Sequence, residues 1–188
     1  GDHPMEFLPK QITLKDGSVA TLRKPEMTDA EGLLDYLQTI CGETDFMMRT
    51  KEEAESMTVE GERKWLSSIA ESEYTVVCEW NGEIVGNASL MFSRAFRKSH
   101  IATVGIGVKK KCWHLGIGTA LMTELLAEAE RRPNFSHVEL EYIEGNDRAS
   151  ALYQRFGFRT VAEHPNALRR SDGTLCSLFY MQKEIGRE

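Results

Sequence analysis

A short glycine turn near the middle of the chain is the first place where residue types and spacing indicate chemistry. Gly116 and Gly118 follow a strand-like segment and precede a helix-like one. Such a turn leaves backbone N–H groups unpaired at the start of the helix, beside the positive end of the helix dipole. Lys109–Lys111 adds positive charge just before the turn. The pattern predicts a site for a phosphate or pyrophosphate, although a plain strand-to-helix turn with a solvated lysine patch has the same pattern.

Two other nucleotide-binding motifs can be checked at this turn. A dinucleotide fingerprint needs a third glycine three residues after Gly118, and Leu121 stands there. A P-loop needs Lys and then Ser or Thr directly after the second glycine, whereas this chain has Thr119 and Ala120. The turn therefore fits neither motif.

A second motif follows after one more strand-like segment. It begins with Asn146-Asp147-Arg148-Ala149, continues with Leu152-Tyr153 and ends in Gly157-Phe158. Together, the two segments resemble two motifs of the GNAT N-acetyltransferases. The turn is similar to the acyl-CoA signature of that family, Q/R-x-x-G-x-G/A, and the later segment is similar to its N-x-x-A-x-x-L-Y-x-x-x-G-F pattern. The order of the motifs and the strand between them also agree with the family.

The resemblance implies that acetyl-CoA is the cofactor and that it binds in a cleft where two strands splay apart. It assigns the pantetheine arm to Asn146 and to the backbone of Ile106, Gly107 and Val108. The pyrophosphate would bind the amides of the turn, which belong to Leu115, Gly116, Ile117, Gly118 and Thr119. Tyr153 would lie near the sulfur as general acid. Because a free phenol has a pKa of about 10 and a thiol one of about 8.5, this proton transfer needs a short-lived tyrosinate.

Two features depart from the family pattern. Trp113 stands where the family has Gln or Arg, so we expect backbone amides and the neighbouring lysines to bind the phosphates. The strand before the turn, residues 101–107, has no carboxylate, although many relatives have a Glu there. His100, Glu139, Glu141 and a chain of waters are the candidates for the base, and each side chain is equally compatible with a solvated surface position.

The rest of the chain predicts the elements that must position these motifs. Strands are expected at 19–23, 74–80, 83–92, 100–108, 137–143, 158–162 and 176–183, and helices at 28–40, 58–69, 119–131 and 147–156. Asn81 and Gly82 are typical of a hairpin turn in which both residues have positive φ. Residues 41–57 are expected to form a loop that shapes the acceptor site. We therefore expect one α/β (α+β) domain over residues 5–188, with a mixed, mostly antiparallel sheet of about six to seven strands and about four helices.

Composition and charge exclude several other classes of protein. The chain has 188 residues, of which 41% are hydrophobic and 28% charged, values that are typical of a globular domain. No apolar run approaches the roughly 20 residues that span a bilayer. The four cysteines have no metal-ligand spacing, so we expect no metal site and reduced thiols in the cytoplasm. Cys112, beside three lysines, is a candidate nucleophile with a lowered pKa. Residues 1–4 are expected to be a cloning scar or a disordered terminus.

The sequence thus predicts an N-acetyltransferase that moves an acetyl group directly from acetyl-CoA to an amine. The amine acceptor, a small molecule or a peptide, and a homodimer like those of many relatives are left open. A non-catalytic acyl-CoA-binding module is the alternative, because the usual carboxylate and the usual Gln or Arg are both missing. Nucleic-acid binding would rest only on a few basic clusters, and the net charge of −6 opposes it.

Overall fold

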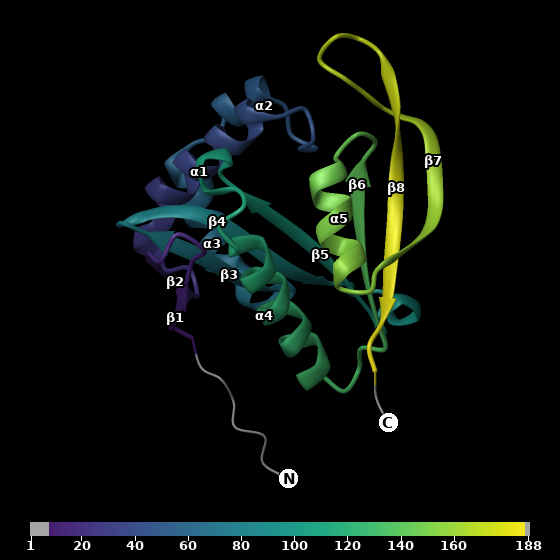
Figure 1. The fold of residues 1–188 in the computed structure, drawn as a ribbon, viewed down its shortest axis with the longest axis horizontal. Helices are drawn as coiled ribbons and strands as arrows, with labels where there is room; N and C mark the ends of the chain where they lie inside the picture. The colour runs from purple at the N-terminus through teal and green to yellow at the C-terminus, as the bar shows by residue number, and fades with distance from the viewer. Residues whose placement is uncertain (1–7, 187–188) are drawn as a thin grey trace.

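The chain folds around a sheet of eight strands in the computed structural model, which describes residues 8–186 except for the side chain of Ala70 (Figure 1). Residues 1–4, for which a scar or disorder was expected, lie outside this range. The strands are β1 (Lys10–Thr13), β2 (Val19–Arg23), β3 (Glu73–Trp80), β4 (Glu83–Phe92), β5 (Ile101–Val108), β6 (His137–Ile143), β7 (Arg159–Arg169) and β8 (Leu175–Glu184). Their spatial order is β1-β2-β3-β4-β5-β6-β8-β7.

One pair of strands opens the sheet. All neighbouring strands are antiparallel except β5 and β6, which are parallel and pair only between residues 101–103 and 137–139. Beyond that point β5 continues to Val108 and β6 to Ile143 without pairing to each other. The exposed polar backbone of this part of β5 is therefore free to bind another extended group. The predicted splay of the two strands is confirmed.

Helices cover both faces of the sheet. They are α1 (Ala30–Glu43), α2 (Lys51–Glu55), α3 (Val59–Ser72), α4 (Ile117–Arg131) and α5 (Asp147–Arg155). Side chains of a strand alternate between faces, and β3 shows this directly. Val76 packs in the cluster that contains Leu125 of α4, whereas Val77 packs with Leu33 of α1. Helices α4 and α5 thus lie on one face, and α1 and α3 lie on the other (Figure 1).

Two elements were not predicted. Strand β1 raises the number of strands from the expected six or seven to eight among the described residues, and α2 raises the number of α-helices from four to five. Helix α2 lies in the segment that was expected to be a loop. Its first turn has a capping box, in which the Thr50 hydroxyl accepts from the Glu53 N–H and the Glu53 carboxylate accepts from the Thr50 N–H, both at 3.1 Å. The sequence contained this signal for a helix start.

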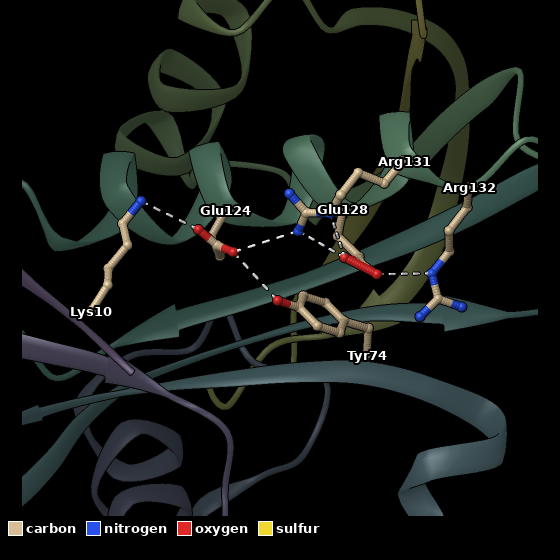
Figure 2. A network of polar contacts seen from close by, with 6 residues as sticks. All are labelled: Lys10, Tyr74, Glu124, Glu128, Arg131 and Arg132. Carbon is tan, nitrogen blue, oxygen red and sulfur yellow. Dashed lines mark hydrogen bonds and ion pairs between the residues drawn. The ribbon is translucent and has the colours of Figure 1, made fainter. Parts of the chain in front are cut away.

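A buried polar network fixes α4 to the sheet (Figure 2). Glu124 of α4 is only 2% exposed, and its carboxylate lies 3.4 Å from Lys10 Nζ of β1 and 3.7 Å from Arg131 of the same helix. The Tyr74 hydroxyl of β3 donates to it at 3.4 Å. Glu128 extends the network to Arg132, at 3.2 Å. Since a buried charge is stabilised only when it is paired, these contacts restrict how α4 sits on the sheet.

Candidate active site

The glycine turn forms the start of α4. Gly116 has a φ of +96°, which favours glycine, and its carbonyl accepts the first helical bond from Ala120 N–H at 3.0 Å. The amides of residues 117–119 consequently have no acceptor within the helix, and no side-chain hydrogen bond from the described residues caps its start. A cavity of about 110 Å³ is bounded by Gly116, Ile117, Gly118 and Thr119. Leu115, which was grouped with them, does not line this cavity; its carbonyl accepts from Lys15 N–H at 3.0 Å.

Cations surround this small cavity, but they differ from those expected. The lining includes Lys15, Arg148 and Arg155. By contrast, Lys109 is buried, and its Nζ donates to Asp35 at 2.7 Å and lies 3.4 Å from Glu83. Lys111 also forms an ion pair with Glu83. The expectation that the lysine run faces the phosphate site is therefore wrong for these two residues, because carboxylates already neutralise them.

Trp113 holds one of these cations in position. Its indole N–H donates to the carbonyl of Val108 at 2.9 Å, which fixes the ring at the end of β5. The Arg148 guanidinium lies over the ring, with Cζ 3.8 Å from the centroid. Arg148 borders both the small cavity and the larger one between β5 and β6. At the position where the family has Gln or Arg, this chain therefore has an aromatic ring with a cation from α5 stacked on it.

The opening between β5 and β6 contains a cavity of about 520 Å³. Ile106, Gly107 and Val108 form its β5 side, and Asn146 and Tyr153 reach it from the α5 side. Every residue that was assigned to the pantetheine or to the sulfur thus borders one cavity. Asn146 is also the N-cap of α5, where its side-chain oxygen accepts from the Ala149 N–H at 3.4 Å. Contact of these residues with a cofactor stays a prediction.

Tyr153 is the buried phenol of this cavity. Burial raises its pKa to about 12, and the nearby charge of Arg148 lowers it in part. Among residues 8–186 no hydrogen-bond partner of its hydroxyl is found, and the ring lies between Tyr142 and Phe158. The hydroxyl is therefore protonated at neutral pH and available as a donor.

A third cavity, of about 580 Å³, lies on the α1 and α3 face of the sheet. It shares part of its lining with the cavity between β5 and β6, including Arg49 and the stretch from Gly105 to Gly107. It also contains two carboxylates, Glu62 and Glu73, whose pKa values burial raises. Neither residue is among the candidates that the sequence predicts. The spacing of Glu62 with Trp65, Leu66 and Ile69 was the missed signal, because it places the acid on the apolar face of the helix.

The candidates for the base differ in whether they line one of these cavities. His100 and Glu139 border none of these three cavities, whereas Glu141 lines the one between β5 and β6. Cys112 is 1% exposed, and burial raises the pKa of its thiol. The expected lowered pKa of Cys112 is therefore wrong, since desolvation outweighs the charge of the neighbouring lysines.

Metal-binding and membrane-spanning features were also searched. In the described part of the chain no group of three or more His, Cys, Asp or Glu side chains is arranged to hold a metal ion. None of the helices within residues 8–186 combines the length and apolar character needed to cross a membrane.

Comparisons with known proteins agree with the geometry. The chain is 28% identical over 103 residues to the L-amino acid N-acetyltransferase AaaT of Escherichia coli strain K12; the match covers 55% of this chain and 63% of the relative. A solved GNAT-family acetyltransferase from Streptococcus pneumoniae has a TM-score of 0.81 at 24% identity, covering 89% of this chain and 99% of that one. The structure of yncA from Salmonella typhimurium, a protein described as a putative acetyltransferase with its cofactor acetyl-CoA, has a TM-score of 0.75 at 19% identity, covering 90% and 95%.

At these identities the solved structures establish a shared fold. The profile of the Acetyltransferase (GNAT) family matches residues 38–158, which is more than half of the chain and includes both motifs and the strand between them. The chain therefore belongs to the GNAT family of acetyltransferases.

Proposed function

We propose that this protein transfers the acetyl group of acetyl-CoA to a primary amine. The observation that carries the proposal is the continuity of three cavities. The cation-lined cavity at the glycine turn shares Arg148 and Gly118 with the cavity between β5 and β6, and that cavity shares the stretch from Gly105 to Gly107 with the one beneath α1 and α3. The pyrophosphate, the pantetheine arm and the acceptor amine would thus each have a cavity, and the three cavities are connected.

The residues of the first two cavities fit acetyl-CoA. The free amides of residues 117–119 and the cations Lys15, Arg148 and Arg155 are complementary to a pyrophosphate. The unpaired edge of β5 offers backbone groups to the amides of a pantetheine arm. The acetyl-CoA in the yncA structure supports the same ligand for this fold.

The chemistry requires a neutral amine and a donor for the leaving sulfur. The amine nitrogen forms a bond to the acetyl carbon, the carbon–sulfur bond breaks with the electron pair going to the sulfur, and the nitrogen releases one proton to solvent or a base. Tyr153 is suited to donate to the sulfur because its phenol is protonated and has no other partner among the described residues. Full proton transfer from a phenol of raised pKa to a thiolate is uphill, so we propose a donated hydrogen bond that strengthens as charge develops.

Relatives support an amine as the acceptor. AaaT is named for L-amino acids, and it is matched over less than two thirds of its length. A second acceptor class appears among the solved neighbours, where a protein from Brucella melitensis is named as a ribosomal-protein-alanine N-acetyltransferase. Both names describe proteins that acetylate amino groups, and the cavity beside β5 is the space in which this chain would hold one.

One observation favours a second candidate, a module that binds acyl-CoA without catalysis. β5 (Ile101–Val108) contains no carboxylate that could serve as base. The cavity with Glu62 and Glu73 argues against this candidate, because a pure binding module has no need for a second cavity joined to the first.

A thermal-shift titration followed by a turnover assay tests the proposal. Acetyl-CoA at 100 times its dissociation constant should stabilise the protein by about 2.7 kcal/mol, which is a shift of several degrees, whereas ATP and NAD should give none. Release of free thiol with a panel of primary amines then separates the transferase from the binding module. No shift with acetyl-CoA would contradict both.

A further inference from the structure

The cavity beneath α1 and α3 contains a carboxylate that has no partner among residues 8–186. Glu62 of α3 is 4% exposed, yet within the described part of the chain its carboxylate forms no hydrogen bond or ion pair. The charge of Arg49, an exposed side chain at the cavity rim, influences it only at longer range. Protein encloses most of this side chain without giving its carboxylate a donor, so Glu62 is placed to accept hydrogen bonds from a ligand in the cavity.

Other polar groups in the same cavity also indicate a ligand that donates hydrogen bonds. The side-chain oxygen of Asn87 is fully buried and accepts no hydrogen bond from the residues that the structure describes. Glu73, in contrast, accepts from the hydroxyl of Thr75 at 3.3 Å and is hydrogen-bonded to Trp65. The cavity therefore presents unsatisfied acceptors, and Arg49 at the rim is the one cationic side chain among its lining residues. Its complement is a ligand with several N–H donors and positive charge.

The position of Glu62 separates it from the point of acetyl transfer. The lining shared with the cavity between β5 and β6 includes Gly105, Gly107 and Arg49, and acetyl transfer must occur where the two cavities meet. Glu62 and Trp65 belong only to the α3 end. Apolar side chains lie along the rest of the cavity, namely Leu33, Leu37, Ile40, Met57 and Met91.

We propose that the acceptor is a diamine, whose far cationic group binds Glu62 while its other amine is acetylated beside β5. The apolar walls contact the methylene chain between the two nitrogens, and the cation supplies the donors that Glu62 lacks. This inference rests on the proposed function, because it names the acceptor of that transfer. A volume of about 580 Å³ is within the usual range for small-molecule sites.

Matched pairs of amines test the proposal. The acceptors 1,4-diaminobutane and 1,5-diaminopentane are compared with butylamine and pentylamine, which lack only the second cation. For the unchanged protein we expect kcat/KM to be about tenfold or more higher for each diamine, through a lower KM, because hydrogen bonds to charged groups contribute this much to binding. Equal kcat/KM values for the two members of each pair would overturn the proposal.

Three variants assign the preference to Glu62. Glu62→Gln should lose the preference and treat both members of a pair alike, whereas Glu62→Asp should keep part of it. The control is Glu60→Gln, because Glu60 lies on the same helix, is exposed and forms an ion pair with Arg63. Equal losses in the Glu62→Gln and Glu60→Gln variants would contradict a specific contact with Glu62.

Calorimetric titration keeps the test independent of catalysis. With coenzyme A present, 1,5-diaminopentane should bind about tenfold or more tightly than pentylamine to the unchanged protein, but not to the Glu62→Gln variant. A protein that binds the diamine in this way but releases no thiol from acetyl-CoA would retain the inference while the proposed function fails. Absence of diamine binding with intact acetyl-CoA binding would overturn the inference alone.

Discussion

The guanidinium of Arg148 stacks on the ring of Trp113, with Cζ 3.8 Å from the ring centroid. The two residues come from different elements, since Trp113 follows β5 and Arg148 lies on α5. Their contact brings a cation to the side of the glycine turn where the family signature has Gln or Arg. The departure in the signature is therefore matched by a charge supplied from elsewhere in the fold.

This contact predicts how acetyl-CoA affinity responds to substitution. Arg148→Gln should weaken binding by roughly tenfold or more, because a charge-assisted hydrogen bond to phosphate is lost. Trp113→Ala should cost less, since the turn amides and Arg148 itself remain. Calorimetric titration with acetyl-CoA measures both. Arg159→Gln, an exposed position that borders none of these cavities, is the control and should bind normally.

A side chain at position 107 should lower the stability of the protein for steric reasons. A Cβ at this position would lie 2.5 Å from the Tyr36 hydroxyl oxygen and 3.4 Å from Ile40, and Tyr36 is fully buried. Gly107→Ala should therefore lower the free energy of unfolding by about 1–3 kcal/mol, as measured by urea denaturation. Gly105→Ala should be milder, because its Cβ would meet only the flexible end of Met91 at 3.5 Å.

A double variant checks the cause of that loss. In the Tyr36→Phe background the clashing oxygen is absent, and the next ring atom is 3.7 Å from the new Cβ. Gly107→Ala should then cost clearly less than in the unchanged protein, which a double-mutant cycle reports as coupling. Additive losses would show that backbone strain, and not the Tyr36 hydroxyl, opposes a side chain at position 107.

Tyr153 predicts a change in turnover without a change in cofactor affinity. Tyr153→Phe should lower kcat about 100-fold, because a donor to the leaving sulfur is lost, and should leave the dissociation constant of acetyl-CoA unchanged. Since burial raises the pKa of Tyr153 to about 12, its deprotonation should not reduce turnover below about pH 10. Tyr180→Phe, outside these cavities, is the control. Unchanged turnover in Tyr153→Phe would remove it from the mechanism.

Glu62 predicts a pH dependence of stability. Burial raises its pKa, and the charge of Arg49 opposes this only in part. The folded protein then holds a proton over a pH window in which the unfolded chain has lost it. Its contribution to stability is therefore largest below the ordinary glutamate pKa and is lost as pH rises through the folded pKa.

The measurement compares melting temperatures of the unchanged protein and Glu62→Gln from about pH 5 to about pH 8. The unchanged protein should gain on the variant as pH falls, because the variant has no proton to take up at this position. At the upper end of this pH range, Glu62→Gln should be at least as stable as the unchanged protein, since it has no buried charge at this position. The exposed Glu60→Gln variant should show no such trend, and a pH-independent difference for Glu62→Gln would contradict a raised pKa.

Local backbone chemistry made much of the fold predictable. Asn81 and Gly82 have φ values of 52° and 76°, as expected for their hairpin turn, and the glycine turn starts α4 as its sequence indicated. β1 was missed because Lys10–Thr13 is short and has a single apolar residue, Ile12, so pairing with β2 stabilises it more than its own pattern does. The conformational preferences of a few residues fix such turns, whereas an edge strand depends on its neighbour.

Candidate site residues could be predicted where they belong to a sequence motif. They could not be predicted where their role depends on contacts between distant parts of the chain. The two motifs contain Gly118, Asn146 and Tyr153, which line the cavity between β5 and β6, and their contact with a cofactor stays a prediction. In contrast, no local pattern indicated that Lys109 would be neutralised by Asp35, or that Arg148 would stack on Trp113. These pairs are distant in the sequence, and their charges acquire a role only when the chain brings the partners together.

Substitution of Cys112 should leave the mechanism unchanged. Cys112 is 1% exposed, and burial raises the pKa of its thiol, so little thiolate is present at neutral pH to attack a thioester. Cys112→Ala should therefore retain turnover and lose only some stability, by about 1 kcal/mol for the small cavity that it leaves. Intact-mass measurement of the unchanged protein with acetyl-CoA should detect no acetylated form. An acetylated peptide containing Cys112, together with loss of turnover in Cys112→Ala, would replace direct transfer with a covalent route.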